Sequence, residues 1–279
     1  MTHRTIHVAH SPDSDDAFMF YALAEGKVDT EGLTYVHELQ DIESLNQRAL
    51  RGELEVTAVS IHAYAFLTDR YALLPSGASM GDQYGPRLVS KTPATRADVK
   101  GKRIAIPGLK TSAYLALRLY EPDFVAVPIH FDEIEQAVLD GTVDLGLIIH
   151  EGQLTYQDNG LHLVVDMGAW WFAETGLPLP LGGNVIRKDF GPQMMQKISR
   201  HLKASIAYAL DHREAALDHA MRFARGLDRS KADVFVGMYV NDWTLDYGER
   251  GREAIRLFLE RGHAAGILPH AVAVEFVDG

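Results

Sequence analysis

A histidine stands at the end of the most apolar short run in this sequence. Residues 143–149 read VDLGLII, and His150 and Glu151 follow directly. Imidazole can accept or donate a proton near neutral pH, because its reference pKa is about 6.5. A polar pair that ends an apolar strand is typical of a side chain held at the edge of a buried sheet, so His150 is a candidate general base. The alternative is a structural or solvated histidine, which most of the 13 histidines are expected to be.

A second candidate site lies in the segment 107–113, which reads PGLKTSA. Gly108 permits a tight turn, and the hydroxyl groups of Thr111 and Ser112 can cap the helix predicted to follow. The N–H groups in the first turn of a helix lack intrahelical partners, so this turn can bind an anion. The segment has neither a P-loop nor a GxGxxG pattern, which makes a single carboxylate a better ligand than a nucleotide phosphate. Capping without any ligand is the alternative.

A third candidate is the acidic segment 11–16, which reads SPDSDD. Carboxylates accept hydrogen bonds from hydroxyl groups, so Ser11 and Asp16 are candidates for binding a sugar-like ligand. The structural alternative is that Ser14 is an N-cap and that the acids stabilise the positive end of a helix. Contiguous acids at a helix start are common, and we expect no metal site here.

A weaker candidate is the end of the run 56–60, which reads VTAVS. Ser60 could face the same sheet edge as the other candidates, with the backbone of Ala58 and Val59 exposed beside it. It could equally cap the helical turn that follows.

The elements that must hold these side chains alternate between short apolar strands and helices. In the first third of the chain, strands at 5–9, 33–39 and 56–60 are separated by helices at 14–24 and 41–50. This order predicts parallel strands with helical crossovers. Ligands of open parallel sheets bind outside the carboxyl ends of the strands, which is where the four candidate segments lie.

A second α/β unit follows, and the chain then becomes helical. The turn-rich stretches 76–91 and 177–183 are the expected crossings between the units. Two crossings predict two α/β lobes with a central cleft, lobe 1 comprising 1–90 and 181–279 and lobe 2 comprising 91–180. Further strands are expected at 103–106, 125–129, 143–149 and 161–165, and further helices at 62–67, 111–120, 132–139, 192 to about 225, and 248–261.

Composition narrows the class of protein. The 279 residues are 47% hydrophobic and 23% charged, which suits two globular domains. The net charge of −11 argues against a nucleic-acid partner, and the absence of cysteine excludes disulfides, thiolate metal sites and a cysteine nucleophile. The N-terminal segment lacks the apolar core of a signal peptide, and no apolar run approaches the roughly 18 residues of a membrane span. We therefore expect a cytoplasmic protein with no membrane partner.

Several segments together resemble the 1,4-dihydroxy-6-naphthoate synthases of the futalosine route to menaquinone. The likeness extends over nearly the whole chain and is most specific around His150. It is carried by SPDSDDAFMFYAL at 11–23, DIESLNQRAL at 41–50, GLKTSA at 108–113, GLIIHEGQLTY at 146–156 and MYVNDWTLDYGERGREA at 238–254.

The resemblance implies a bilobal fold like that of the class II periplasmic solute-binding proteins, and a cytoplasmic enzyme without metal or organic cofactor. Its implied reaction is a carbon–carbon cleavage of cyclic dehypoxanthine futalosine that releases 1,4-dihydroxy-6-naphthoate. The catalytic histidine of the family falls on His150. The family's substrate contacts fall on Ala58 to Ser60 and on Ser112 and Ala113. The related chorismate dehydratases share the fold but lack a histidine at this strand end.

The chain departs from the family in its first motif, which reads closer to SPCPNDTF than to the SPDSDDAF found here. This difference bears on the sugar contacts and on the identity of the substrate. In addition, Ser112 stands where the family has threonine, a change that keeps the hydroxyl donor.

Together, the candidate segments predict how an aromatic carboxylate substrate would bind. Its carboxylate would lie on the N–H groups of Ser112 and Ala113, helped by the Thr111 and Ser112 hydroxyls. Asp16 and Ser11 would bind hydroxyls of the sugar-derived ring, and His150 would act as base in a retro-aldol-type cleavage, with Glu151 either orienting the imidazole or facing solvent. The alternatives are a non-catalytic solute-binding protein of the same fold and a chorismate dehydratase. The sequence does not indicate an oligomeric state.

Overall fold

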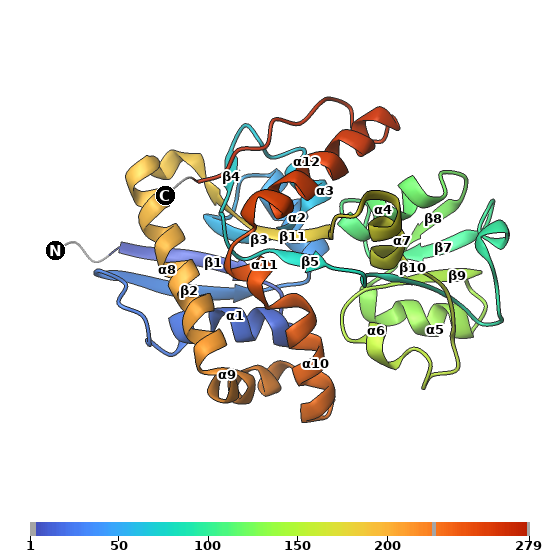
Figure 1. Ribbon diagram of the computed structural model, residues 1–279, viewed down its shortest axis with the longest axis horizontal. Coiled ribbons are helices and arrows are strands. Elements are labelled where there is room, and N and C mark those ends of the chain that lie inside the picture. Colours follow the sequence, from blue (N-terminus) through green and yellow to red (C-terminus); the bar gives the residue numbers. More distant parts are fainter. Residues whose placement is uncertain (1–3, 225–226, 278–279) are drawn as a thin grey trace.

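Two β-sheets, each covered by helices, carry the fold (Figure 1). The computed structural model describes residues 4–224 and 227–277. The first sheet has the order β2-β1-β3-β11-β4, with β5 paired to β11, and the second has the order β10-β6-β9-β7-β8. The first contains β1 (Arg4–His10), β2 (Leu33–Leu39), β3 (Val56–Ser60), β4 (Tyr71–Leu73), β5 (Ser79–Gly81) and β11 (Leu179–Arg187); the second contains β6 (Arg87–Ser90), β7 (Arg103–Ile106), β8 (Val125–Pro128), β9 (Leu145–Ile148) and β10 (His162–Asp166).

The predicted parallel pairing is present at the centre of both sheets. In the first sheet β1 pairs in parallel with β2 and β3, and in the second sheet β7 pairs in parallel with β8 and β9. All four residues of β9 are buried, as its apolar sequence predicts. The carboxyl ends of β1, β3 and β9 therefore carry the candidate segments that follow them in the chain.

The stretch 177–183 is not simply a crossing, because most of it is the start of β11. This strand pairs antiparallel with β3, β4 and β5. Its pairing with β5 shifts register between Pro180 and Gly182, where proline has no N–H to donate to the ladder. The other expected crossing, 76–91, likewise contains β5 and β6.

The division into 1–90 with 181–279 and 91–180 stays a prediction. The chain passes from one sheet to the other a few residues away from these predicted boundaries. Strand β6 already pairs within the second sheet, and β11 pairs within the first sheet from Leu179.

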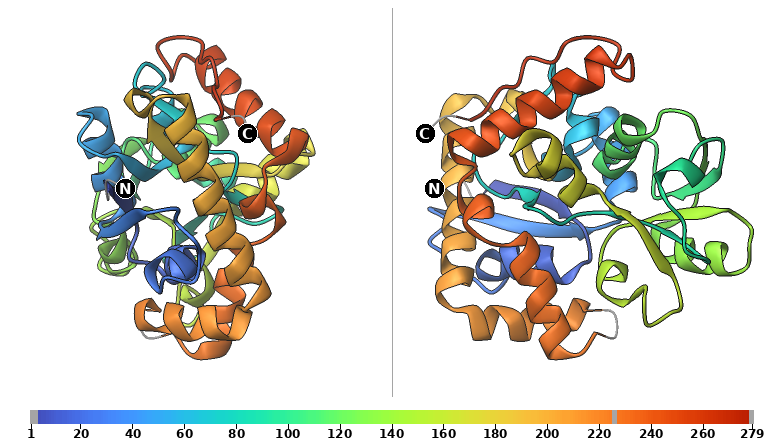
Figure 2. Two further views of the ribbon diagram at one scale, coloured as in Figure 1. Left: turned by 90° about the vertical axis from the view of Figure 1, so that its left-hand side faces the viewer. Right: turned by 45° about the vertical axis from the view of Figure 1, so that its right-hand side comes forward.

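Helices surround the first sheet and cover the second (Figures 1 and 2). The long helix predicted from 192 breaks at His212 into α8 and α9, and its expected end near 225 lies outside the described residues. The sequence analysis missed four helices, α6, α7, α10 and α11. The helices are α1 (Ser14–Ala24), α2 (Ile42–Leu50), α3 (Ile61–Tyr64), α4 (Ser112–Tyr120), α5 (Ile134–Leu139), α6 (Gly152–Thr155), α7 (Met167–Thr175), α8 (Pro192–Asp211), α9 (Arg213–Ala220), α10 (Arg229–Tyr239), α11 (Asp242–Leu245) and α12 (Gly248–Ala264).

One apolar core continues from the first sheet into the second. It includes Leu73 of β4, Ile104 of β7 and Trp171 of α7. Trp171 is fully buried, its ring lies 5.3 Å from that of Phe258 on α12, and its indole N–H donates to the carbonyl of Pro178. The two sheets are thus fixed to each other by packing as well as by the connecting segments.

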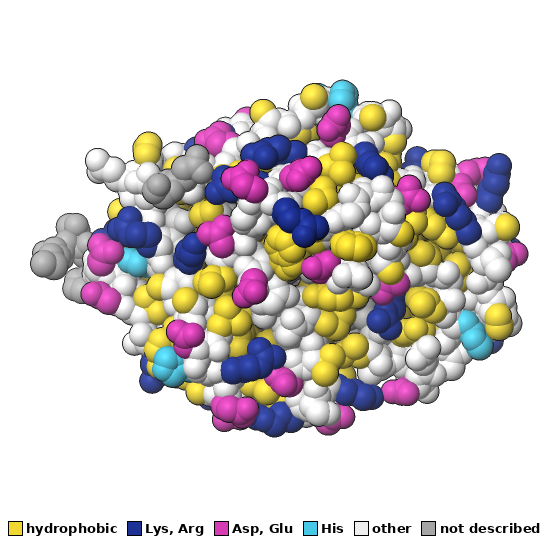
Figure 3. All heavy atoms as spheres, in the orientation of Figure 1, with side chains coloured by type: hydrophobic (Ala, Val, Ile, Leu, Met, Phe, Trp, Pro, Cys, Tyr) yellow, Lys and Arg dark blue, Asp and Glu magenta, His cyan; other side chains and the backbone are white. Residues whose placement is uncertain are grey.

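The surface seen in Figure 3 carries acidic and basic side chains interspersed rather than gathered by sign. In residues 4–224 and 227–277, no helix combines the length and the apolar character that crossing a bilayer requires.

Candidate active site

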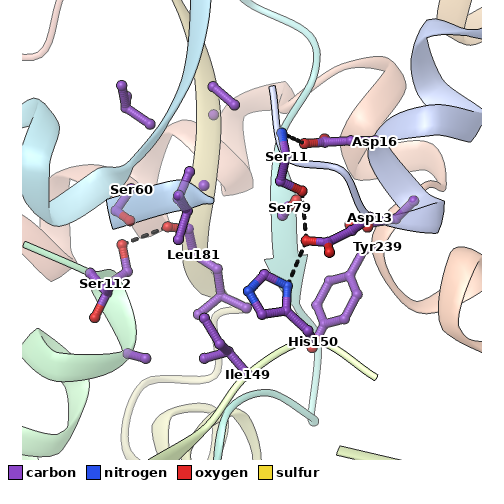
Figure 4. Close-up of a pocket in the computed structure, with 18 of the residues that line it drawn as sticks. Ser11, Asp13, Asp16, Ser60, Ser79, Ser112, Ile149, His150, Leu181 and Tyr239 are labelled. Carbon is purple, nitrogen blue, oxygen red and sulfur yellow. Dashed lines mark hydrogen bonds and ion pairs between the residues drawn. The ribbon is translucent and has the colours of Figure 1, made fainter. Parts of the chain in front are cut away.

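A pocket lies between the two sheets. The segments after β1 and β9, the end of β3 and the first turn of α4 all line it, a placement that suits a small-molecule ligand (Figure 4). The structure brings the nine residues predicted as base or substrate contacts to this one pocket, while their contacts with a ligand stay predictions. They are Ser11, Asp16, Ala58, Val59, Ser60, Thr111, Ser112, Ala113 and His150.

His150 enters the pocket from the end of β9 and meets a carboxylate from the other sheet. Its Nδ1 lies 2.6 Å from Oδ2 of Asp13, and the two side chains are 13% and 2% exposed. The backbone of His150 has φ of +62°, a left-handed conformation that few residues other than glycine adopt. The ring of Phe131 lies 4.5 Å from the imidazole. The histidine is therefore held by its backbone, by an aromatic neighbour and by Asp13.

The acidic segment 11–16 folds into a hydrogen-bonded turn at the start of α1. The Ser11 N–H donates to Oδ2 of Asp16 at 2.7 Å, and the Ser11 hydroxyl donates to Oδ2 of Asp13 at 2.6 Å. Burial, with the nearby charge of Asp13, raises the pKa of Asp16 to about 6. Burial also raises the pKa of Asp15, with the charges of Asp16 and Asp13 adding to it.

The expected N-cap of α1 is wrong by one position. Ser14 is the first helical residue, and Asp13 occupies the N-cap without a capping bond from its side chain. Within the part of the chain that the structure describes, no cluster of three or more His, Asp or Glu side chains is arranged to hold a metal ion.

The first turn of α4 forms the opposite side of the pocket. Thr111 is the N-cap, and its hydroxyl accepts from the Tyr114 N–H and donates to the carbonyl of Gly108. The Ser112 hydroxyl accepts from the His62 N–H and donates to the carbonyl of Leu181 at 2.5 Å. Both hydroxyl protons are thus used within the protein, contrary to the expectation that they help to bind a carboxylate. No described residue accepts a hydrogen bond from the N–H of Ser112 or Ala113, and both residues line the pocket.

Ser60 is fixed by a side chain that the sequence analysis did not select. Asn46 of α2 is fully buried; its Oδ1 accepts from the Ser60 N–H at 2.9 Å, and its Nδ2 donates to the Ser60 hydroxyl at 3.1 Å. The Ser60 hydroxyl is the acceptor in that bond, so its own proton can be donated to a ligand.

Two further residues that line the pocket come from elements far apart in the chain. The hydroxyl of Tyr239, at the end of α10, donates to Oε1 of Gln153 on α6 at 2.7 Å. Burial raises the pKa of Tyr239, which keeps this phenol neutral. The segments 146–156 and 238–254, which contain these two residues, were available as a signal because both carry the family resemblance.

Comparisons with known proteins find relatives over nearly the whole chain. The chain matches a family model described as "Menaquinone biosynthesis" over residues 6–264. It is 42% identical over 264 residues to a 1,4-dihydroxy-6-naphtoate synthase of Thermus thermophilus, covering 93% of this chain and 96% of that protein. It is 39% identical over 275 residues to the protein of the same name from Streptomyces coelicolor, covering 96% of each.

Solved structures show the same fold. Protein AF1704 from Archaeoglobus fulgidus matches with a TM-score of 0.90 and 48% identity, over 94% of this chain and 98% of that chain. The alkanesulfonate-binding protein SsuA from Xanthomonas axonopodis pv. citri, bound to MOPS, matches with a TM-score of 0.72 and 13% identity, over 97% and 96%. The predicted α/β fold of the periplasmic-binding-protein type is confirmed.

Proposed function

The chain belongs to the menaquinone biosynthesis family, and from this premise we propose that it is a 1,4-dihydroxy-6-naphthoate synthase. In this proposal it acts in the cytoplasm as a carbon–carbon lyase on cyclic dehypoxanthine futalosine, and His150 is the general base. The observation that carries the proposal is a single pocket lined both by the first turn of a helix and by a histidine whose side chain is only 13% exposed.

The pocket offers different groups to the two ends of such a substrate. Figure 4 shows Ser112 on one side, Asp13 and Asp16 on the other, and His150 between them in this view. The N–H groups of Ser112 and Ala113 are suited to the aryl carboxylate, because the positive end of a helix stabilises an anion. The acidic side is unsuited to an anion and suited to hydroxyl groups, which donate to carboxylates.

The proposed reaction is a general base-catalysed cleavage of the retro-aldol type. His150 removes the proton of a hydroxyl on the sugar-derived ring, and the oxygen electron pair forms a carbonyl as the neighbouring carbon–carbon bond breaks. The electrons of that bond enter the second ring of the product, which becomes aromatic. A positioned base contributes about 10²–10⁴-fold to such a step. The low exposure of His150 and Asp13 keeps water from competing for the proton.

Product analysis tests the proposal directly. The purified chain is incubated with cyclic dehypoxanthine futalosine and, separately, with chorismate, and the products are identified by chromatography with mass spectrometry. We expect 1,4-dihydroxy-6-naphthoate from the first incubation and no turnover in the second. Binding of the futalosine without turnover would support a solute-binding protein, and conversion of chorismate would support a dehydratase. Either result would overturn the proposal.

Ser112→Pro is expected to raise KM at least about tenfold above that of Ser112→Ala. Proline at the first helical position removes one N–H but suits the helix, and Thr111 before it has ψ of 148°, which a following proline requires. Both variants lose the serine hydroxyl, so their difference reports the N–H. A hydrogen bond to a charged group contributes about 1.5–3 kcal/mol, or roughly 10- to 150-fold. Steady-state kinetics measures KM. Equal KM values in the two folded variants would show that the substrate carboxylate does not bind at this helix start.

A further inference from the structure

Asp13 occupies a helix N-cap but does not cap the helix. Its backbone is extended, with φ of −103° and ψ of 160°, as an N-cap requires, yet its side chain accepts no bond from the first turn of α1. Three other N-cap aspartates of this chain, Asp41, Asp166 and Asp228, each accept an N–H of their own helix at 2.9–3.1 Å. Capping is what an aspartate at this position usually does. The Asp13 carboxylate is used for something else.

The Asp13 carboxylate is directed at His150 instead. Its Oδ2 lies 2.6 Å from Nδ1 of His150 and also accepts the Ser11 hydroxyl at 2.6 Å. The side chain of Asp13 is 2% exposed, so water screens this interaction little. Hydrogen bonds with an ionised partner are short and about twice as strong as neutral ones. Figure 4 shows both contacts converging on one side of the carboxylate.

The contact fixes the state of the imidazole as well as its orientation. A carboxylate acceptor at Nδ1 places the proton of the neutral ring on that nitrogen, which leaves the lone pair on Nε2. Asp13 follows β1 of the first sheet and His150 follows β9 of the second, so the pair is complete only when the two sheets are together as they are here. At position 13 the family motif given above has cysteine, so this pair is not part of the resemblance.

We propose that Asp13 is a positioning residue for His150: it holds the proton on Nδ1, aims Nε2 at the reacting hydroxyl, and stabilises the imidazolium that forms when the base takes a proton. The reaction role rests on the proposed function. The pairing itself does not, because it is a property of the protein without substrate.

Asp13→Asn tests the proposal, because asparagine keeps the size and one acceptor oxygen but removes the charge. Nitrogen-15 NMR of histidine-labelled protein reports the protonated ring nitrogen and the titration midpoint of His150, whose signal is assigned by its loss in His150→Asn. We expect wild-type His150 to carry its proton on Nδ1. In Asp13→Asn we expect the midpoint to fall by about one pH unit or more, since an opposite charge at this distance favours the charged form. We also expect kcat to fall about 10- to 10³-fold, the acid limb of its pH profile to move with the midpoint, and KM to stay within about threefold.

Asp15→Asn is the matched control, because it removes a carboxylate from the same segment, one that interacts with Asp16, Asp13 and Glu151. We expect it to leave the Nδ1 tautomer in place and to shift the His150 midpoint by less than half as much. If Asp13→Asn does not fold, Asp13→Ser gives the same test, since serine is a favoured N-cap residue. An unchanged tautomer and midpoint in the folded variant would overturn the proposal. Failure of the proposed function is seen separately, as wild-type protein that forms no naphthoate while its NMR titration still reports the pair.

Discussion

We expect His150→Asn to lower kcat for naphthoate formation by at least about 10²–10⁴-fold, the contribution of a positioned general base. Asparagine is the informative replacement because His150 has φ of +62°, and asparagine is among the residues that adopt this conformation at low cost. Its amide can also donate to Asp13 in place of Nδ1. The fold should therefore be kept while the proton acceptor is lost. Steady-state kinetics with product detection, beside circular dichroism and thermal unfolding, measures both.

His162→Asn is the control for this prediction. His162 is an exposed residue of β10 in the same sheet and does not line the pocket. We expect its kcat within about twofold of wild type. Turnover by folded His150→Asn at a third or more of the wild-type rate would show that another group accepts the proton.

The placement of the candidate site was predictable because it depends on local pattern. All residues of strand β9 are buried, and His150 is the first polar residue after this apolar run. Parallel strands carry their carboxyl ends to the same edge of a sheet, so Ser11 and Ser60 could be placed together without knowing any contact between them. The predicted cleft between two lobes then placed His150, at the end of a strand in the second unit, opposite them. The glycine and hydroxyl residues of 108–112 likewise mark a turn and a helix start in any context.

What the sequence did not reveal depends on partners that are distant in the chain. The segment 177–183 has the proline and glycine content of a linker, yet it extends as β11 because β3, β4 and β5 offer it backbone partners. The Ser112 hydroxyl was expected to bind the ligand, but its acceptor is the carbonyl of Leu181 on that same strand. Once β11 was missed, the use of this hydroxyl could not be foreseen.

Asp13 shows the same limit at the centre of the site. The local pattern assigned capping of α1 to Ser14 and gave Asp13 no partner, whereas Asp41 at the start of α2 does cap its own helix. Both aspartates have the extended backbone of an N-cap, with ψ of 160° and 155°, but the tertiary fold brings a histidine near Asp13. The carboxylate of Asp13 contacts His150 of the other sheet and accepts no N–H of its own helix.

Acid should destabilise the fold through a second buried imidazole, that of His10. This residue ends β1, is 4% exposed, and lies between the carbonyl of Ser11, 3.0 Å from its Nδ1, and Nδ1 of His37, 3.1 Å from its Nε2. The Ser11 carbonyl requires the proton on Nδ1 of His10, so Nε2 accepts from His37, and a second proton on His10 would force this bond to reverse and His37 to change its tautomer. Burial, with the nearby His37, lowers the pKa of His10 to about 3. Burial lowers the pKa of His37 as well.

The sign of the pH effect follows from linkage. The folded chain keeps His10 neutral down to about pH 3, whereas the unfolded chain protonates it near pH 6.5, so the contribution of His10 to stability is lost as pH falls through that window. Between pH 7.5 and 4.5 the expected loss is about 2–3 kcal/mol. Asp16 acts in the opposite direction, because its pKa is raised to about 6 in the folded chain, and its burial becomes less costly as pH falls. The pH dependence of the free energy of unfolding of the wild type alone therefore underestimates the contribution of His10.

His10→Gln isolates that effect, because it shares the carboxylates of the wild type and lacks the titrating ring. We expect the variant to be less stable than wild type at pH 7.5, where it loses the packing of the imidazole on Phe20, with ring centroids 4.4 Å apart. The difference in free energy of unfolding between wild type and His10→Gln should then be smaller by about 2–3 kcal/mol at pH 4.5 than at pH 7.5. Urea unfolding followed by circular dichroism and tryptophan fluorescence measures it. The exposed His162→Gln controls for the substitution itself and should leave the free energy of unfolding at pH 7.5 close to that of wild type. A gap for His10→Gln that stays constant from pH 7.5 to 4.5 would mean that the His10 ring is charged in the folded chain, and the neutral His10–His37 pair would then be wrong.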